Sequence, residues 1–179
     1  MLIVEGADCV GKTTLCRSLW SHPRIQALGM EIQHLSRLPE GHNRCSHYIE
    51  RMNINGIFDR FVLSEIAYQR MRGDAQLLTM DKRMLVECAL KLHCSFTVLI
   101  VAERPQVIDG NWNKDEMYSK EQVHTVNRHF SNLTTSTLVD LVISRYEADD
   151  YPNVDMIENI VSQYVTKRER FKDIYGSTT

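Results

Sequence analysis

The stretch VEGADCVGKTT, residues 4–14, decides how the rest of the chain is interpreted. Gly6 to Thr13 fits the pattern G-x-x-x-x-G-K-[ST], with the apolar run LIVE before it and a helical pattern after it. Gly6 and Gly11 allow positive φ, so successive N–H groups can point inward at phosphate oxygens, beside the positive end of the following helix. The stretch therefore predicts a phosphate-binding loop between a strand and a helix.

Two side chains of this loop carry the expected chemistry. Lys12 is expected to bridge the β- and γ-phosphates of a nucleotide, and the Thr13 hydroxyl is expected to bind Mg²⁺. The residues expected to contact the nucleotide are Gly6, Ala7, Asp8, Cys9, Val10, Gly11, Lys12, Thr13 and Thr14.

Length, charge and cysteine content limit the class of protein. The chain has 179 residues, 43% of them hydrophobic, which fits one domain over residues 1–179. With 21 Lys+Arg against 23 Asp+Glu and no long like-charge run, duplex nucleic acid is not favoured as a partner. Five cysteines without a CxxC pair predict reduced thiols and a cytoplasmic protein. We expect no signal peptide before the first apolar run, and no apolar stretch reaches the roughly 18–20 residues that span a bilayer.

Short apolar runs alternate with stretches of helical period, which is typical of an α/β protein. The runs FTVLIVA and LVDLVIS are rich in β-branched residues, as expected for a parallel sheet covered on both faces. We therefore expect a doubly wound, five-stranded parallel sheet flanked by helices. The expected strands are residues 2–5, 31–36, 57–59, 96–102 and 138–144.

Apolar residues at helical spacing predict the buried faces of the helices. One helix is expected to follow a cap at Asp81, and its face could cover the sheet or contact a second copy of the chain. Its apolar residues are Met84, Leu85, Cys88, Ala89 and Leu92. The next helix begins at a Ser119/Gln122 capping box and the last follows Pro152.

A second motif, GIFDRFVLSEIAYQ, occupies residues 56–69. It predicts a short strand, Asp59 and Arg60 at its carboxyl end, and a helix that begins near Ser64. Ligands of doubly wound sheets bind at the carboxyl ends of strands, so both side chains should face the same crevice as the phosphate loop. Arg60 can hold a second phosphate through two hydrogen bonds, and Asp59 can bind Mg²⁺ or hold Arg60 in place.

Together, VEGADCVGKTT and DRFVLSEIAYQ resemble thymidylate kinase and related deoxynucleoside monophosphate kinases, of the P-loop nucleoside monophosphate kinase superfamily. That family has a Glu-Gly-x-Asp-Gly-x-Gly-Lys loop and a later Asp-Arg-aromatic-x-x-Ser-x-x-Ala-Tyr-Gln segment. The resemblance implies Mg²⁺-dependent transfer of the γ-phosphoryl group of ATP to a deoxynucleoside monophosphate, with a dTMP-like pyrimidine favoured. It also implies a homodimer.

The resemblance implies roles for particular residues. Asp8 would lie near the acceptor sugar and the metal, and would form the catalytic set with Lys12 and Arg60. Tyr68 and Gln69 would contact the acceptor sugar or base, although Tyr68 could equally pack in the core.

The family also places an aromatic residue and an arginine one helical turn apart, to contact the base and the phosphate. Within an acceptor-binding region at residues 38–55, the candidates are His47 or Tyr48 together with Arg51. A solvated Arg51 beside a core Tyr48 is the competing interpretation.

The chain departs from the family pattern at two places. Position 9 is Cys where the family has Gly or Arg, and residues 104–120, the expected lid, lack an arginine cluster. Phosphoryl transfer depends on cationic charge at the transition state, so a missing cation predicts slow turnover or a different acceptor. The candidates for the missing cation are Arg104, Lys114, Lys120 and, on the following helix, Arg128.

Two other functions are left open. A kinase of a hydroxyl group, on a deoxynucleoside or on a modified base in nucleic acid, would need Glu5, Asp8 or Asp59 as a general base. A non-catalytic nucleotide-binding module would suit the lid without arginines. The presence of Lys12, Thr13, Asp59 and Arg60 together argues against that module.

Overall fold

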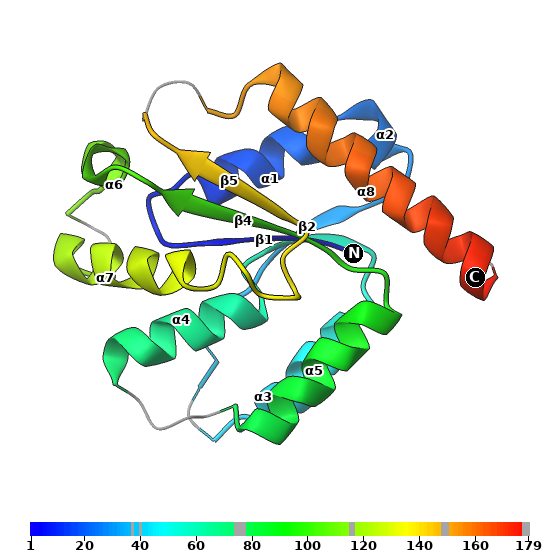
Figure 1. Cartoon of the computed structure of the whole chain (residues 1–179), viewed down its shortest axis with the longest axis horizontal. Coiled ribbons are helices and arrows are strands. Elements are labelled where there is room, and N and C mark those ends of the chain that lie inside the picture. The colour runs from blue at the N-terminus through cyan, green and yellow to red at the C-terminus, as the bar shows by residue number, and fades with distance from the viewer. Residues whose placement is uncertain (37, 40, 74–77, 115–116, 148–150, 177–179) are drawn as a thin grey trace.

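The computed structural model describes residues 1–36, 38–39, 41–73, 78–114, 117–147 and 151–176 (Figure 1). Every strand pairing is parallel, and the strand order is β2-β3-β1-β4-β5. The expected five-stranded parallel sheet is confirmed. Its strands are β1 (Leu2–Gly6), β2 (Glu31–His34), β3 (Gly56–Asp59), β4 (Phe96–Ala102) and β5 (Leu141–Arg145).

Helices cover both faces of the sheet (Figure 1). The view along the layers shows α1, α2 and α8 on one side of the sheet and α3, α4, α5 and α7 on the other. None of the helices in the described ranges is both long enough and apolar enough to cross a bilayer. The helices are α1 (Lys12–Trp20), α2 (Pro23–Gln26), α3 (Arg44–Arg51), α4 (Val62–Arg72), α5 (Met80–Leu92), α6 (Pro105–Asn111), α7 (Lys120–Ser131) and α8 (Val154–Tyr175).

The centre of the sheet forms the core. Every residue of β1 and of β4 is buried, because helices lie on both faces of these strands. The edge strand β5 is only partly buried, and its exposed and buried residues alternate in part. The run FTVLIVA forms β4, which lies beside the central strand β1, and this position explains why nearly all of its residues are apolar.

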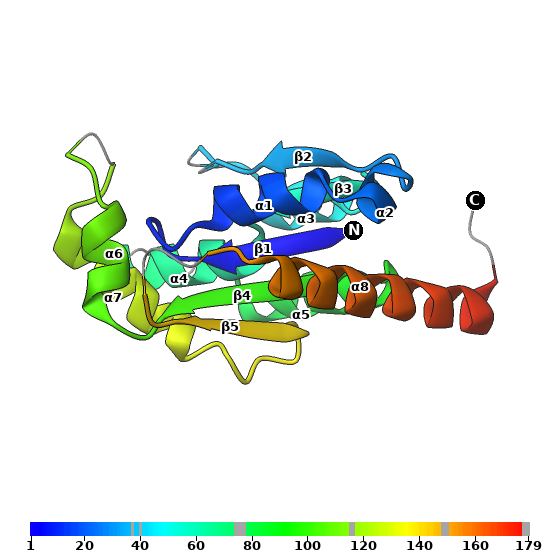
Figure 2. The same ribbon diagram turned by 90° about the horizontal axis from the view of Figure 1, so that it is seen from above.

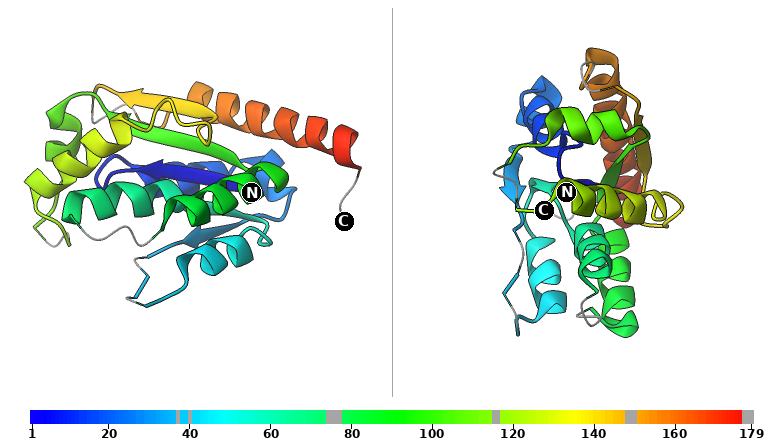
Figure 3. Two further views of the ribbon diagram at one scale, coloured as in Figure 1. Left: turned by 60° about the horizontal axis from the view of Figure 1, so that its bottom comes forward. Right: turned by 90° about the vertical axis from the view of Figure 1, so that its left-hand side faces the viewer.

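The strand order brings the two sequence motifs together. Strands β3 and β4 lie on either side of β1, so the loop after β1 and the residues after β3 reach the same end of the sheet. Val4 pairs with Asp59, and the backbone N–H of Arg60 donates to the carbonyl of Val4 at 2.9 Å. Figures 2 and 3 show that α6 and α7 lie beyond the carboxyl ends of β4 and β5, at the same end of the molecule.

The predicted core face of α5 is wrong. Its buried residues are Val86 and Leu90, whereas Met84 and Leu85 are 56% and 54% exposed. Helix α5 packs against α3, so only a narrow stripe of it is covered. Apolar residues occur on more than one side of this helix, and their period alone does not show which side packs.

Two substitutions of the same kind test which face of α5 is packed. Leu90→Ala should lower the free energy of unfolding by about 2–5 kcal/mol, because it leaves a cavity in the core. Leu85→Ala should change it by less than about 0.5 kcal/mol, because that side chain is exposed. Urea denaturation of both variants measures the difference, and equal losses would show that the Leu85 face is also covered.

Candidate active site

At two positions of the phosphate loop, the backbone conformation and the close neighbours leave room only for glycine. Gly6 has φ of 147°, and a Cβ there would lie 2.6 Å from the carbonyl oxygen of Ile100. Gly11 has φ of 88°, and a Cβ there would lie 2.7 Å from the ring of Tyr151. Cys9 also has a positive φ, of 64°, at the position where the resembled pattern has Gly or Arg. A residue other than glycine in this conformation has a small amount of backbone strain.

Lys12 points back into the loop. It is buried, its Nζ donates to the carbonyl of Ala7 at 2.5 Å, and it lies 3.8 Å from Oδ1 of Asp8. Burial lowers the pKa of Lys12, and the nearby charge of Arg60 lowers it further. An anionic phosphate in the loop would favour the charged lysine and offset both effects.

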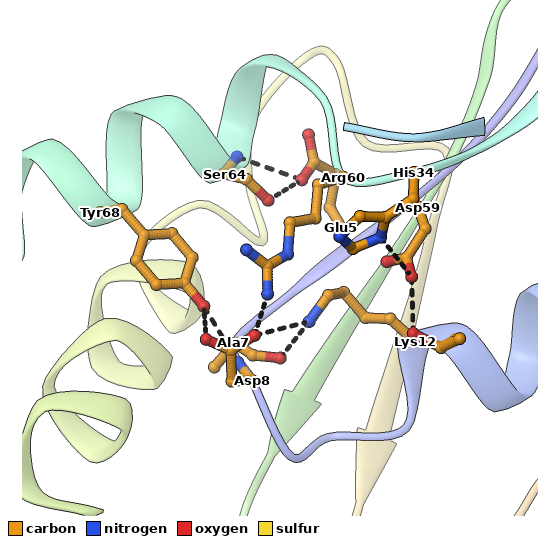
Figure 4. Close-up of polar contacts among 10 residues, drawn as sticks. Glu5, Ala7, Asp8, Lys12, His34, Asp59, Arg60, Ser64 and Tyr68 are labelled. Atoms are coloured by element: carbon orange, nitrogen blue, oxygen red, sulfur yellow. Dashed lines mark hydrogen bonds and ion pairs between the residues drawn. The ribbon is translucent and has the colours of Figure 1, made fainter. Parts of the chain in front are cut away.

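Asp8, Arg60 and Tyr68 form a compact cluster at the mouth of the loop (Figure 4). Arg60 Nη2 donates to Asp8 Oδ1, and the Tyr68 hydroxyl donates to Asp8 Oδ2 at 2.7 Å. The Arg60 guanidinium also lies over the Tyr68 ring, 5.4 Å from its centroid. Burial and the Asp8 charge raise the pKa of Tyr68 well above its usual range, so its hydroxyl stays protonated as a donor.

Asp59 offers oxygen atoms beside the phosphate loop. Its Oδ2 accepts a hydrogen bond from the Thr13 hydroxyl at 2.6 Å and lies 3.2 Å from Nδ1 of His34. Its Oδ1 is buried and has no hydrogen-bond partner among the described residues. A carboxylate and a hydroxyl beside a phosphate site suit Mg²⁺, which takes few protein ligands and completes its shell with phosphate and water. No cluster of three His, Cys, Asp or Glu side chains that could hold a metal ion occurs in the described part of the chain.

Glu5 lies beneath the site and does not line it. Its carboxylate accepts the backbone N–H groups of Leu63 and Ser64 at 2.9 and 3.1 Å, and the Ser64 hydroxyl also donates to it. It therefore caps the first turn of α4 from the strand that precedes the phosphate loop. Burial raises the pKa of Glu5 to about 7.

Two cavities meet at this cluster, and Asp8 and Arg60 line both. The first, of about 330 Å³, is the phosphate cavity, which the loop residues, Asp59 and Asn111 line. The second, of about 220 Å³, is lined by residues that the resemblance places on the acceptor side, and we call it the acceptor cavity. It is lined by the end of β2 and the residues after it, by Tyr48 on α3, by Phe61, by α4 from Ser64 to Arg72, and by Met117 and Tyr118.

Only some of the expected acceptor residues reach the acceptor cavity. Tyr48 and Tyr68 line it, while His47, Arg51 and Gln69 are not among its lining residues. The Tyr48 side chain is 4% exposed and still borders the cavity, so the core interpretation and the acceptor interpretation of Tyr48 both stay open.

Gln69 is held by a buried network that the sequence analysis missed. Its Nε2 donates to Oε1 of Glu65 at 2.6 Å, and Arg44 Nε donates to the same oxygen at 2.9 Å. The Tyr48 hydroxyl donates to Oε2 of Glu65 at 3.3 Å. Glu65 and Gln69 are four residues apart on one helix, and this spacing could have predicted their contact from the sequence.

The lid candidates do not reach either cavity. Lys120 lies 3.6 Å from Asp109 and 5.5 Å from the Trp112 ring, and Arg104 lies 5.9 Å from the Tyr146 ring. Lys114 is exposed, and Arg128 donates to Thr125 on its own helix. The arginine and lysine side chains that line the two cavities are Lys12, Arg60 and Arg72.

Comparison with known proteins agrees with this architecture. No protein-family model matches the chain, and no curated protein matches its sequence. The YorR protein of Bacillus subtilis, whose crystal structure is in complex with phosphorylated GDP, superimposes with a TM-score of 0.73. It is 20% identical over 94% of this chain and 97% of that chain. The chain has a P-loop kinase-like fold.

The buried carboxyl of Glu5 predicts a pH dependence of stability. Its pKa rises from 4.5 to about 7 on folding, so the folded state binds this proton more tightly than the unfolded chain does. The contribution of Glu5 is therefore complete below pH 4.5 and is lost as the pH rises through 7, a change of about 3 kcal/mol. Gln at this position stays neutral at every pH. Urea titrations between pH 4.5 and 8 measure the unfolding free energy of the wild type and of Glu5→Gln. We expect the wild type to lose stability relative to Glu5→Gln as the pH rises through 7. A difference that stays constant with pH would contradict this prediction.

Proposed function

We propose that the protein is a nucleotide kinase that transfers the γ-phosphoryl group of ATP to the phosphate of a deoxynucleoside monophosphate. The observation that carries this proposal is the meeting of two cavities at Asp8 and Arg60, one at a phosphate loop and one beside it. Transfer between two bound phosphates requires this adjacency. The phosphorylated GDP in the similar YorR structure supports a nucleotide ligand for the fold.

The side chains suit in-line transfer without a covalent intermediate. The donor phosphates would take the backbone N–H groups of the loop and the ammonium of Lys12. The acceptor phosphate would take the guanidinium of Arg60, replacing the carboxylate of Asp8 as its anionic partner. Thr13 and Asp59 would hold Mg²⁺, which neutralises phosphate charge when bound. An acceptor phosphate is already ionised at neutral pH, so no general base is needed.

The segment between β4 and α7 suits the role of a lid. Asn111, at the end of α6, lines the phosphate cavity, and Tyr118, just before α7, lines the acceptor cavity. One short segment therefore borders both substrates, so its closure would exclude water from both at once.

The geometry favours a phosphate acceptor over a hydroxyl acceptor. A hydroxyl acceptor needs a carboxylate free to take its proton, but Glu5 is fully buried and bonded to α4. Asp8 is ion-paired with Arg60, and Asp59 faces Thr13. The dTMP-like acceptor, the homodimer and the cytoplasmic location expected from the sequence stay predictions.

Release of ADP from MgATP tests the proposed reaction. The acceptors are dTMP, dUMP, dGMP, dCMP, dAMP, the hydroxymethylpyrimidine monophosphates and the free nucleosides. We expect turnover on at least one monophosphate, and a loss of about 100-fold or more in kcat/KM in Arg60→Ala, because the acceptor phosphate loses its cation.

Two controls make this result specific. Binding of MgATP, measured by calorimetry, should fall much less than kcat/KM in Arg60→Ala, because the loop and Lys12 are intact although Arg60 also lines the phosphate cavity. Arg60→Lys should recover part of the activity, since it restores the charge but not the paired hydrogen bonds. Turnover on nucleosides only, or on none of the acceptors, would contradict the proposed function.

A further inference from the structure

A histidine and a carboxylate lie side by side where the two cavities meet. Nδ1 of His34, the last residue of β2, lies 3.2 Å from Oδ2 of Asp59, the last residue of β3 (Figure 4). The two residues are direct partners in the parallel pairing of these strands, so their side chains leave the same face of the sheet. The backbone N–H of Leu35 also donates to the carbonyl of Asp59 at 3.1 Å. The sheet itself therefore holds the imidazole beside the carboxylate.

The burial of this pair is unusual for a histidine and a carboxylate. His22 and Glu158 form a surface pair with a distance of 2.9 Å, in which the carboxylate side chain is 58% exposed. In the site pair the Asp59 side chain is only 1% exposed, whereas the His34 side chain is 56% exposed. Water can hydrate the carboxylate of the surface pair, but it has little access to Asp59.

The buried carboxylate of Asp59 is short of partners. No lysine or arginine of the described residues forms an ion pair with it, and its Oδ1 has no hydrogen-bond partner among them. Its Oδ2 accepts from the Thr13 hydroxyl. Burial of an ionised carboxylate is costly unless a charge of opposite sign compensates it. A divalent cation on the side that faces the cavities would supply that charge.

Three side chains offer ligand atoms for such a cation. The Thr13 hydroxyl lies 2.6 Å and the His34 imidazole 3.2 Å from the same oxygen of Asp59. Neighbouring ligands of one octahedral ion, with bonds of about 2.1 Å, lie about 3 Å apart, and both spacings are close to this value. Thr13 and Asp59 line the phosphate cavity and His34 lines the acceptor cavity. An ion held by all three would lie at the boundary of the two cavities.

The nitrogen atom of His34 changes which ion these ligands suit. Mg²⁺ takes oxygen ligands, whereas an imidazole is a ligand of first-row transition ions. At a site of mixed nitrogen and oxygen ligands, affinity rises from Mn²⁺ to Co²⁺. A site with Thr13 and Asp59 alone suits Mg²⁺, and the addition of one imidazole favours Mn²⁺ and, more strongly, Co²⁺.

From this geometry we propose that His34 is a nitrogen ligand of the metal ion, and that the site binds Mn²⁺ or Co²⁺ more tightly than Mg²⁺. The inference rests on the proposed function, because it concerns the metal ion of the same site. It goes beyond that function by adding a ligand and by naming the class of ion. The two sequence motifs pointed to Thr13 and Asp59 only, because His34 ends the edge strand β2 and belongs to neither motif.

Electron paramagnetic resonance of bound Mn²⁺ tests this ligand directly. Mn²⁺ is added to the protein with and without ADP, and the protein carries ¹⁵N-labelled histidine so that its nitrogen is distinct from that of the nucleotide. We expect a hyperfine coupling of bound Mn²⁺ to histidine ¹⁵N in the wild type and its loss in His34→Asn. His22→Asn is the matched control, since it removes the histidine of the surface pair, and it should keep the coupling.

Competition between ions tests the preference. The concentrations of Mg²⁺ and of Co²⁺ that displace half of the bound Mn²⁺ are measured for the wild type and both variants. We expect Co²⁺ to displace Mn²⁺ at a lower concentration than Mg²⁺ does, and the ratio of the two concentrations to fall by about 10-fold or more in His34→Asn only. Asn keeps an N–H group that can donate to Asp59, so a role limited to holding the carboxylate would leave this ratio unchanged.

These measurements separate the inference from the proposed reaction, because neither needs phosphoryl transfer. Bound Mn²⁺ without histidine coupling, an unchanged ratio in His34→Asn, or no binding of Mn²⁺ in either sample would overturn the inference, even if the protein phosphorylates a monophosphate. Coupling that depends on His34 in a protein that phosphorylates no monophosphate would support the inference while the proposed function fails.

Discussion

The carboxylate of Glu5 joins the two halves of the candidate site. It belongs to β1, one residue before the phosphate loop begins, and it caps the first turn of α4, which lines the acceptor cavity. Two backbone N–H groups that would be unsatisfied at a buried helix end are thereby satisfied. Glu5 thus links the strand that leads into the phosphate loop to the helix that lines the acceptor cavity, and it is not among the lining residues of either cavity.

Asp8 supplies the negative charge that the cations of the candidate site face. Its carboxylate accepts from Arg60 and Tyr68 and lies near Lys12, so two cations that face buried surroundings share one anion. Leaving either cation without a counter-charge would cost several kcal/mol. Under the proposed function, phosphate groups that enter the cavities would take over this neutralisation, and ligand binding would compete with Asp8 for the same cations.

Sequence reasoning succeeded where the signal is local. The phosphate loop, the apolar strands and the pair Asp59-Arg60 each lie in one short stretch, and the alternation of strands and helices orders them in the sheet. The packed face of α5 could not be obtained in this way, because the helix is apolar on more than one side and only its contact with α3 selects Val86 and Leu90. The period of a helix indicates that a face is apolar, and tertiary packing decides whether it is covered.

The contact between Arg72 and Tyr118 shows the same limit at the site. The two residues are separated by 46 positions, and nothing in either local pattern indicates the other. Their meeting depends on the packing of α4 against α7, which places the end of the lid segment over the acceptor cavity. The expected lid cations Arg104, Lys114 and Lys120 are not among the residues that line the two cavities, and their role stays a prediction. Arg72 of α4 and Tyr118, just before α7, both line the acceptor cavity, and only the packing of the two helices brings them together.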